Sequence, residues 1–118
     1  MTEEQALLTR IRRGDRIECE EVLVIIEAGY HYQPHRFVNG PPGQQCDNPA
    51  GTNEVSCRLF AFAQQHRLTV AETLACFGHH YRDGVLTDPQ GSGHTNLRIF
   101  ARHGWAHLTM PEAVLTPR

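Results

Sequence analysis

The 118-residue sequence has no lysine, and its eleven basic residues are arginines spread along the chain. Proteins that bind nucleic acid usually gather basic side chains into a patch that neutralises phosphates. The net charge of this chain is −2, and no such cluster is present. We therefore expect no nucleic-acid partner.

Long apolar segments are missing as well. The longest unbroken apolar run is Val22 to Ile26, far short of the roughly 20 residues of a membrane-spanning helix. The sequence starts Met1-Thr2-Glu3-Glu4, without the apolar stretch of a signal peptide. These features predict a cytoplasmic protein with no membrane partner.

The cysteines form no Cys-x-x-Cys pair of the kind that zinc sites and redox motifs use. For a protein that is not exported, we expect reduced thiols rather than disulfides; the cysteines are Cys19, Cys46, Cys57 and Cys76. Apolar residues make up 40% and charged residues 20% of the chain. This balance predicts one folded domain over residues 1–118.

Hydrophobic periodicity and capping signals predict a mainly helical chain. Thr2 and Gly14 flank the first helix, and the Thr69–Glu72 capping box starts the fourth. The third should be central and buried, because Leu59 to Ala63 are apolar nearly all round. The expected helices span residues 2–13, 17–28, 53–66, 69–77, 81–86 and 95–103.

Two segments are expected to form strands. Residues 30–38 are rich in aromatics, and Pro34 confines them to the edge of a sheet. Residues 41–51, with three prolines, predict a long loop, and residues 105–110 a short strand that pairs with residues 32–38. The expected fold class is α+β: a mainly helical single domain with a small antiparallel sheet.

Polar side chains gather at the starts of two predicted helices. Asn53, Glu54 and Ser56 stand at the start of the third helix, and Asn96 and Arg98 at the start of the last. A helix N-terminus favours anions, so this pattern suggests an anion-binding pocket between the two helix starts. We include Tyr81 among the predicted binding residues of the pocket. The alternative is structural: caps, and an ion pair of Arg98 with Asp83 or Glu54.

Cys57 and His94 are the candidate catalytic residues. Cys57 lies in the first turn of the third helix, where the helix dipole favours a thiolate. With His94 as base, Cys57 would be the nucleophile of a hydrolase or transferase. The alternative is a buried structural cysteine, which is how most free cysteines behave.

The eight histidines raise the question of a metal site. The pairs His31/His35 and His103/His107 have the spacing that suits zinc on a continuous helix. Pro34 and Gly104 prevent a continuous helix through either pair, and the adjacent His79 and His80 should point to different faces of their segment. We predict no metal site and no cofactor.

Several of these segments together resemble the HopJ family of type III effectors. The resemblance runs from about residue 30 to residue 115 and rests on five blocks: Asn53-Glu54-x-Ser56-Cys57, Leu74-Ala75-Cys76-Phe77-Gly78, Tyr81-Arg82-Asp83, His94-x-Asn96-Leu97-Arg98 and Gly104-Trp105. Val55 stands where the family pattern leads us to expect glycine. The resemblance implies no defined biochemical activity.

The sequence thus leaves three functions open. The first is a binding or regulatory module whose polar pocket takes an unknown small molecule or protein. The second is the cysteine-dependent enzyme. The third is a translocated effector that acts on a host protein. An export segment should be flexible and polar, whereas residues 2–13 predict a capped amphipathic helix, which favours a cytoplasmic location.

Overall fold

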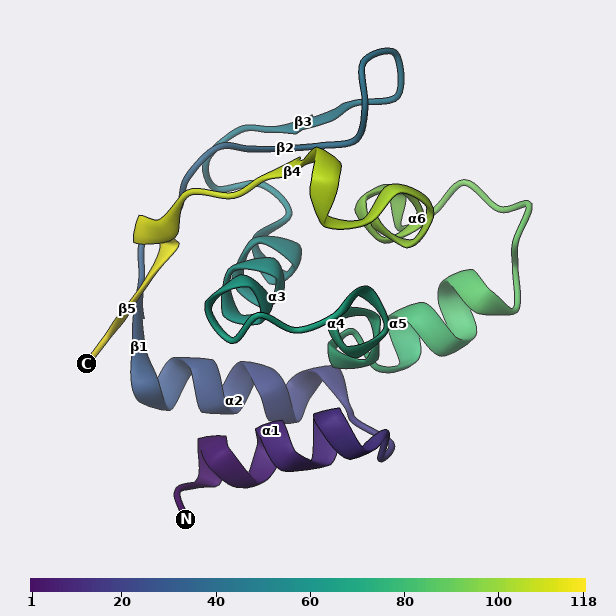
Figure 1. Cartoon of the computed structure of the whole chain (residues 1–118). Helices are drawn as coiled ribbons and strands as arrows, with labels where there is room; N and C mark the ends of the chain where they lie inside the picture. Colours follow the sequence, from purple (N-terminus) through teal and green to yellow (C-terminus); the bar gives the residue numbers. More distant parts are fainter.

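The structure is a computed structural model that describes all 118 residues, Met1–Arg118. Figure 1 shows helices α1 (Glu3–Arg13) and α2 (Cys19–Gly29) side by side along one edge, and strands along the opposite edge. Helix α3 (Glu54–Gln65) lies between them. No helix is both long and apolar enough to cross a membrane. The predicted α+β class, mainly helical with small antiparallel sheets, is confirmed.

The first two helices follow the predicted signals. Thr2 accepts a hydrogen bond from the Gln5 amide, and the Gln5 side chain bonds back to the Thr2 amide, which completes a capping box. Gly14 ends α1 with φ +84°, a conformation that glycine adopts without strain. Helix α2 begins at Cys19, slightly later than predicted.

The buried centre of the molecule is the predicted third helix. Phe60 of α3 is fully buried, and its ring centroid lies 5.0 Å from that of Phe100, 5.2 Å from that of Phe77 and 6.2 Å from that of Phe37. These tilted and edge-on contacts are the preferred geometry of aromatic pairs. Phe60 of α3 therefore packs against strand β2 (Phe37–Asn39), the residue after helix α4 (Val70–Cys76) and helix α6 (Thr95–His103).

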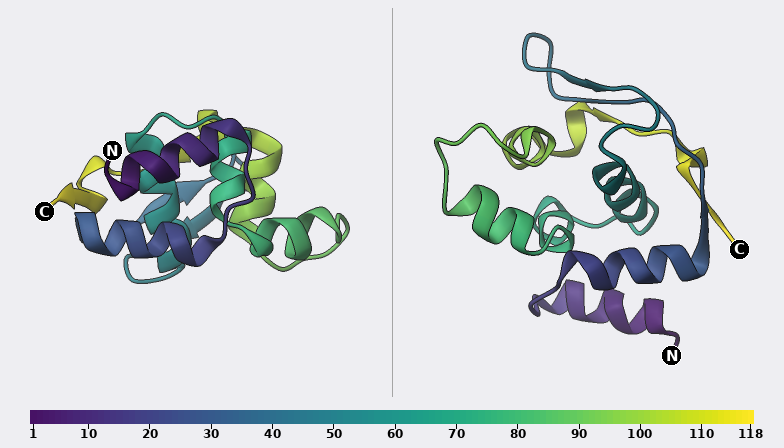
Figure 2. Two further views of the ribbon diagram at one scale, coloured as in Figure 1. Left: turned by 90° about the horizontal axis from the view of Figure 1, so that it is seen from below. Right: turned by 180° about the vertical axis from the view of Figure 1, so that it is seen from behind.

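The second half of the chain is a series of short helices. Helix α4 (Val70–Cys76) is followed by α5 (His79–Tyr81) and the π-helical turn η1 (Arg82–Leu86), which project to one side of the molecule (Figure 2). Helix α6 (Thr95–His103) has the predicted bounds and leads into the 3-10 turn η2 (Gly104–His107).

The strands form two separate antiparallel sheets. Strand β2 (Phe37–Asn39) lies between β3 (Cys46–Asn48) and β4 (Leu108–Thr109), and Val38 faces Thr109. The predicted pairing of residues 105–110 with residues 32–38 is confirmed at Val38 and Thr109, but the strand is shorter than predicted, because residues 105–107 form a 3-10 turn. The second sheet joins β1 (Tyr30–Tyr32) to β5 (Leu115–Pro117), which follows the 3-10 turn η3 (Glu112–Val114).

Two strand predictions were wrong in detail. Residues 30–38 are not one strand: Gln33 to Arg36 interrupt it, and its halves belong to different sheets. Pro34 accounts for the break, because it has no amide hydrogen for a ladder bond. Residues 41–51 are not entirely loop, since they contain β3.

The four cysteines are all free.

Candidate functional site

A cleft with a volume of about 480 Å³ opens between the first turns of α3 and α6 and the residues that follow α4. The first turns of both helices supply part of its lining. Its lining residues are Cys46, Asn53, Val55, Ser56, Phe77, His80, His94, Thr95, Asn96 and Leu97. The structure thus brings together four of the residues predicted from sequence, Asn53, Ser56, His94 and Asn96.

Helix α3 begins at the cleft without a side-chain cap. Asn53, its N-cap residue, has the left-handed conformation with φ +49°, and its side chain accepts no bond from the helix. Asparagine tolerates this region better than most residues do. The Asn53 side chain instead donates to Asn48 Oδ1 at 2.7 Å. The first amides of α3 therefore have no capping acceptor.

Helix α6 begins in the same way on the facing wall. His94 is its N-cap, with φ +57° and no side-chain cap bond. The His94 ring lies against Gly84, where a Cβ atom would be only 2.7 Å from His94 Nε2. On the cleft side, its ring centroid is 5.5 Å from that of His80. Glycine at position 84 is thus what leaves room for the His94 imidazole.

A cluster of asparagines holds the two helix starts together. Asn48, fully buried on β3, accepts bonds from Asn53 of the α3 start and from Asn96 of α6, the latter at 2.8 Å. Asn39 donates to the Asn96 carbonyl at 2.9 Å and to its side chain at 3.1 Å. Buried amides are stable only when paired in this way. The relative position of the two helices is therefore fixed by side chains beneath the cleft.

The electrostatic character of the cleft favours anions. None of its lining residues is acidic or an arginine. Two helix N-termini, each equivalent to a partial positive charge, face it with uncapped amides. Burial, together with the nearby His79 and His94, lowers the pKa of His80, so this imidazole is neutral at neutral pH.

Cys57 does not line this cleft, so the structure does not bring it together with His94 there. The Cys57 side chain is 1% exposed and is absent from the cleft lining. It lies on the other side of α3, near Tyr32 and the His35 backbone. Burial raises the pKa of the Cys57 thiol, against a smaller lowering by hydrogen bonds from those two neighbours. A position in a first turn does not by itself say which side of the helix a side chain faces.

Three other predicted binding residues also have local partners away from the cleft. Glu54 accepts a bond from the Tyr32 hydroxyl at 3.1 Å. Tyr81 packs against the hydrophobic core. Arg98 donates to the carbonyl oxygens of residues 84, 88 and 93 and lies 3.8 Å from the Asp88 carboxylate. The acidic neighbour of Arg98 is thus Asp88 rather than Asp83 or Glu54, the two expected partners.

Sequence reasoning missed Asn48, His80 and Cys46 as parts of this region. Asn48 lies inside what was predicted to be a loop, and its partner Asn96 is 48 residues away. His80 was set aside because adjacent histidines should diverge, whereas its ring centroid is only 4.2 Å from that of His79. Both histidines also approach Glu20 of α2, so this group is the one candidate here for metal ligation.

The comparisons with known proteins agree with the resemblance found in the sequence. The model of the HopJ type III effector protein family matches residues 4–115, so the chain belongs to the HopJ family. The chain is also similar to a protein of unknown function, VPA0580, whose crystal structure is known. The two sequences are 35% identical, and the two structures superpose with a TM-score of 0.91. The match covers 99% of this chain and 95% of that one. No curated protein matches the chain.

Proposed function

We propose that this member of the HopJ family is a binding module whose cleft takes a small anionic ligand, a phosphate or carboxylate group. One observation carries the proposal: two helices begin at the same cleft, and neither N-cap side chain accepts a bond from the helix amides. Backbone N–H groups at a helix N-terminus bind anions through hydrogen bonds and the helix dipole.

The surroundings of these amides support an anion rather than a cation. No carboxylate lines the cleft, while His80 and His94 stand on its wall. Ser56 and Thr95 supply hydroxyl groups that can donate to an anionic oxygen. Because burial lowers the pKa of His80 below the ordinary value of about 6.5, this imidazole gains its charge only in more acidic solution, and we expect anion binding to strengthen as the pH falls below that value.

The left-handed N-caps strengthen this interpretation. A residue other than glycine in this conformation costs of order 1–3 kcal/mol and persists only where its surroundings enforce it. Of the positive-φ residues other than glycine, Asn53 and His94 flank the cleft. The conformation turns each side chain away from its own helix and leaves the amides free for a ligand.

The experiment is calorimetric titration with inorganic phosphate, followed by sulfate and acetate to separate phosphate-like from carboxylate ligands. His94→Gly keeps the backbone conformation and removes the imidazole. We expect it to weaken phosphate binding at least about tenfold, the value of a hydrogen bond to a charged group. Thr69→Ala, at the start of α4 and away from the cleft, is the matched control and should bind as the wild type does. No saturable binding of any of the three anions would refute the proposal.

The cysteine-dependent enzyme receives no such support, since Cys57 is buried away from the cleft. The family description, type III effector protein, favours export and action on a host protein as a second candidate function. Residues 3–13 nevertheless form an ordered helix with a capping box, which supports our proposal of a cytoplasmic location. Expression in a strain with and without a functional type III apparatus tests this choice, since a cytoplasmic protein stays in the cell pellet of both.

A further inference from the structure

Side chains of two distant segments meet beside the cleft in an arrangement typical of metal ligands. Glu20 of α2 and His79 and His80 of α5 each offer one ligand atom, and these atoms all lie within 4.8 Å of one another. We infer that this group binds a divalent transition metal ion of the zinc class. The inference goes beyond the proposed anion binding and does not depend on it, because Glu20 and His79 lie outside the cleft lining.

The backbone brings these residues together through an unusually close approach. Gly78 has φ +57°, and a Cβ atom built on it would lie 2.7 Å from the Cys19 amide nitrogen at the start of α2. Only glycine allows the chain to pass so near that helix. The two residues that follow, His79 and His80, are thereby set beside the first turn of α2 and its Glu20.

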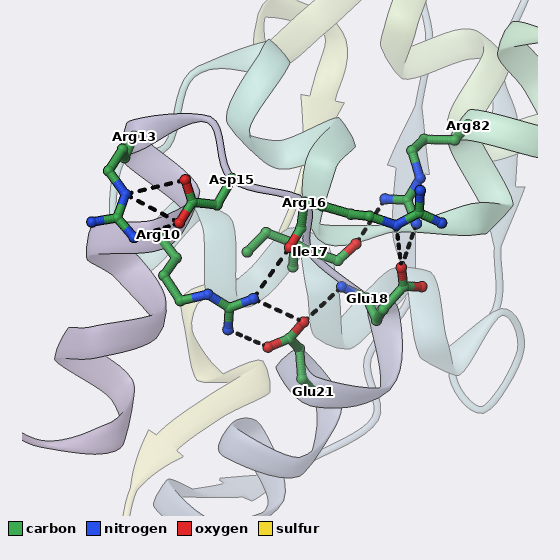
Figure 3. A network of polar contacts seen from close by, with 8 residues as sticks. All are labelled: Arg10, Arg13, Asp15, Arg16, Ile17, Glu18, Glu21 and Arg82. Atoms are coloured by element: carbon green, nitrogen blue, oxygen red, sulfur yellow. Dashed lines mark hydrogen bonds and ion pairs between the residues drawn. The ribbon is translucent and has the colours of Figure 1, made fainter.

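Arginine contacts hold the same two segments in place. Arg82, in the turn after α5, donates to the Ile17 carbonyl at 2.8 Å and to the Glu18 carboxylate. Figure 3 shows Arg16 reaching Glu18 alongside Arg82, while Arg10 reaches Glu21 one turn further along α2. These arginine contacts therefore hold the two segments together. They do not involve the side chains of Glu20, His79 and His80, which stay available for a metal ion.

The donor set has the chemistry that zinc prefers. Zinc binds imidazole nitrogen and carboxylate oxygen at about 2.0–2.2 Å, which places tetrahedral ligands roughly 3.3 Å apart. Glu20 is exposed, so its side chain can rotate and bring its carboxylate oxygen closer to the two histidine nitrogens than in the present arrangement, where the ligand atoms lie within 4.8 Å of one another.

The surrounding groups complete the site. His79 Nδ1 lies 3.9 Å from Glu18 Oε2, a carboxylate of the kind that orients the ring of a metal-bound histidine. Three protein ligands leave a fourth position open for water or a ligand, and the His94 ring stands nearby, with its centroid 5.5 Å from that of His80.

The test uses the untagged full-length chain after dialysis against a chelator, titrated with zinc chloride alone. We expect one zinc ion per chain, bound at least about tenfold more weakly by Glu20→Gln and by His79→Gln, since even outer-shell changes cost that much. Cobalt(II) should give the visible absorption of a tetrahedral site in the wild type and lose it in both variants.

The control is the double variant His103→Gln/His107→Gln, which removes a close histidine pair outside the proposed site, with ring centroids 6.0 Å apart. It should bind zinc as the wild type does. Equal zinc affinity in Glu20→Gln, His79→Gln and the wild type, or a loss confined to the control, would show an adventitious ion only. Circular dichroism verifies that each variant is folded. Phosphate titration of Glu20→Gln separates the two proposals, because the anion cleft should remain intact in it.

Discussion

Helices α4 and α3 both begin at a residue suited to capping, yet the two starts are built in opposite ways. Thr69 has an extended backbone, accepts a bond from the Glu72 amide, and receives the Glu72 side chain on its own amide. Asn53 has a left-handed backbone and gives its side chain to Asn48 instead. The difference shows that a residue type predicts a helix start well but does not predict what the helix amides face.

The same contrast holds between α1 and α6. Thr2 closes a complete capping box at the start of α1, whereas His94 leaves the start of α6 uncapped and strained. The capped starts line no part of the anion cleft, while both uncapped starts do. We therefore regard the missing caps as a property of the site, maintained by the asparagine cluster beneath it.

The largest effect on stability should come from a change in the hydrophobic core, against which all of these helices pack. Phe60→Ala should lower the free energy of unfolding by ~3–5 kcal/mol, because three other aromatic rings surround the buried side chain and limit collapse of the cavity. Urea melts measure this loss. A value below about 1 kcal/mol would show that α3 is not the buried centre of the fold.

The next largest effect should come from the link between the two uncapped starts. Asn48→Ala removes the acceptor of Asn53 and Asn96, at a cost of about 1–3 kcal/mol for the buried Asn96 amide left unpaired. It should also weaken phosphate binding, because the two helices lose their fixed relative position. If stability falls while phosphate affinity stays the same, the asparagine cluster supports the fold but does not shape the cleft.

A smaller loss is expected at a capped start. Thr69→Ala should cost about 1 kcal/mol of stability in thermal or urea unfolding. Phosphate affinity should be unchanged, since Thr69 does not line the cleft. A loss of affinity comparable to that of the cleft variants would remove the distinction between the two kinds of start.

The smallest effect on stability, and one of opposite sign, is expected at His94. Glycine relieves the left-handed strain but adds freedom to the unfolded chain. His94→Gly should therefore leave the unfolding free energy unchanged or raise it by up to about 1 kcal/mol, while phosphate binding weakens at least about tenfold. Destabilisation by more than about 1 kcal/mol would assign the imidazole a structural role against Gly84 instead.

The sequence predicted local features of this fold better than distant ones. The bounds of α6 were predicted because Gly104 stops the helix and an apolar stripe fills it. The start of α1 was predicted from Thr2 and the acidic residues after it, and the start of α4 from the capping box of Thr69 and Glu72. The pairing of β1 with β5 was missed, since it joins residues 30 and 117 across nearly the whole chain.

The candidate site divides in the same way. The polar helix starts at Asn53 and Asn96 were evident in the sequence, because capping residues stand out next to apolar runs. The contact of Asn48 with both, and of Glu20 with His79, depends on tertiary packing that no local pattern encodes. Cys57 illustrates the same limit. Its place in the first turn of α3 was predicted correctly, but the direction in which its side chain points depends on packing near Tyr32.

The most direct test of the anion cleft is a titration of the isotope-labelled chain with inorganic phosphate, followed through backbone amide chemical shifts. The account predicts saturable shifts at Val55, Ser56, Asn96 and Leu97, whose amides stand at the two uncapped starts, and none at Val70 and Ala71 of the capped start. Shifts of equal size at both kinds of helix start, or shifts confined to the histidine side chains, would contradict it.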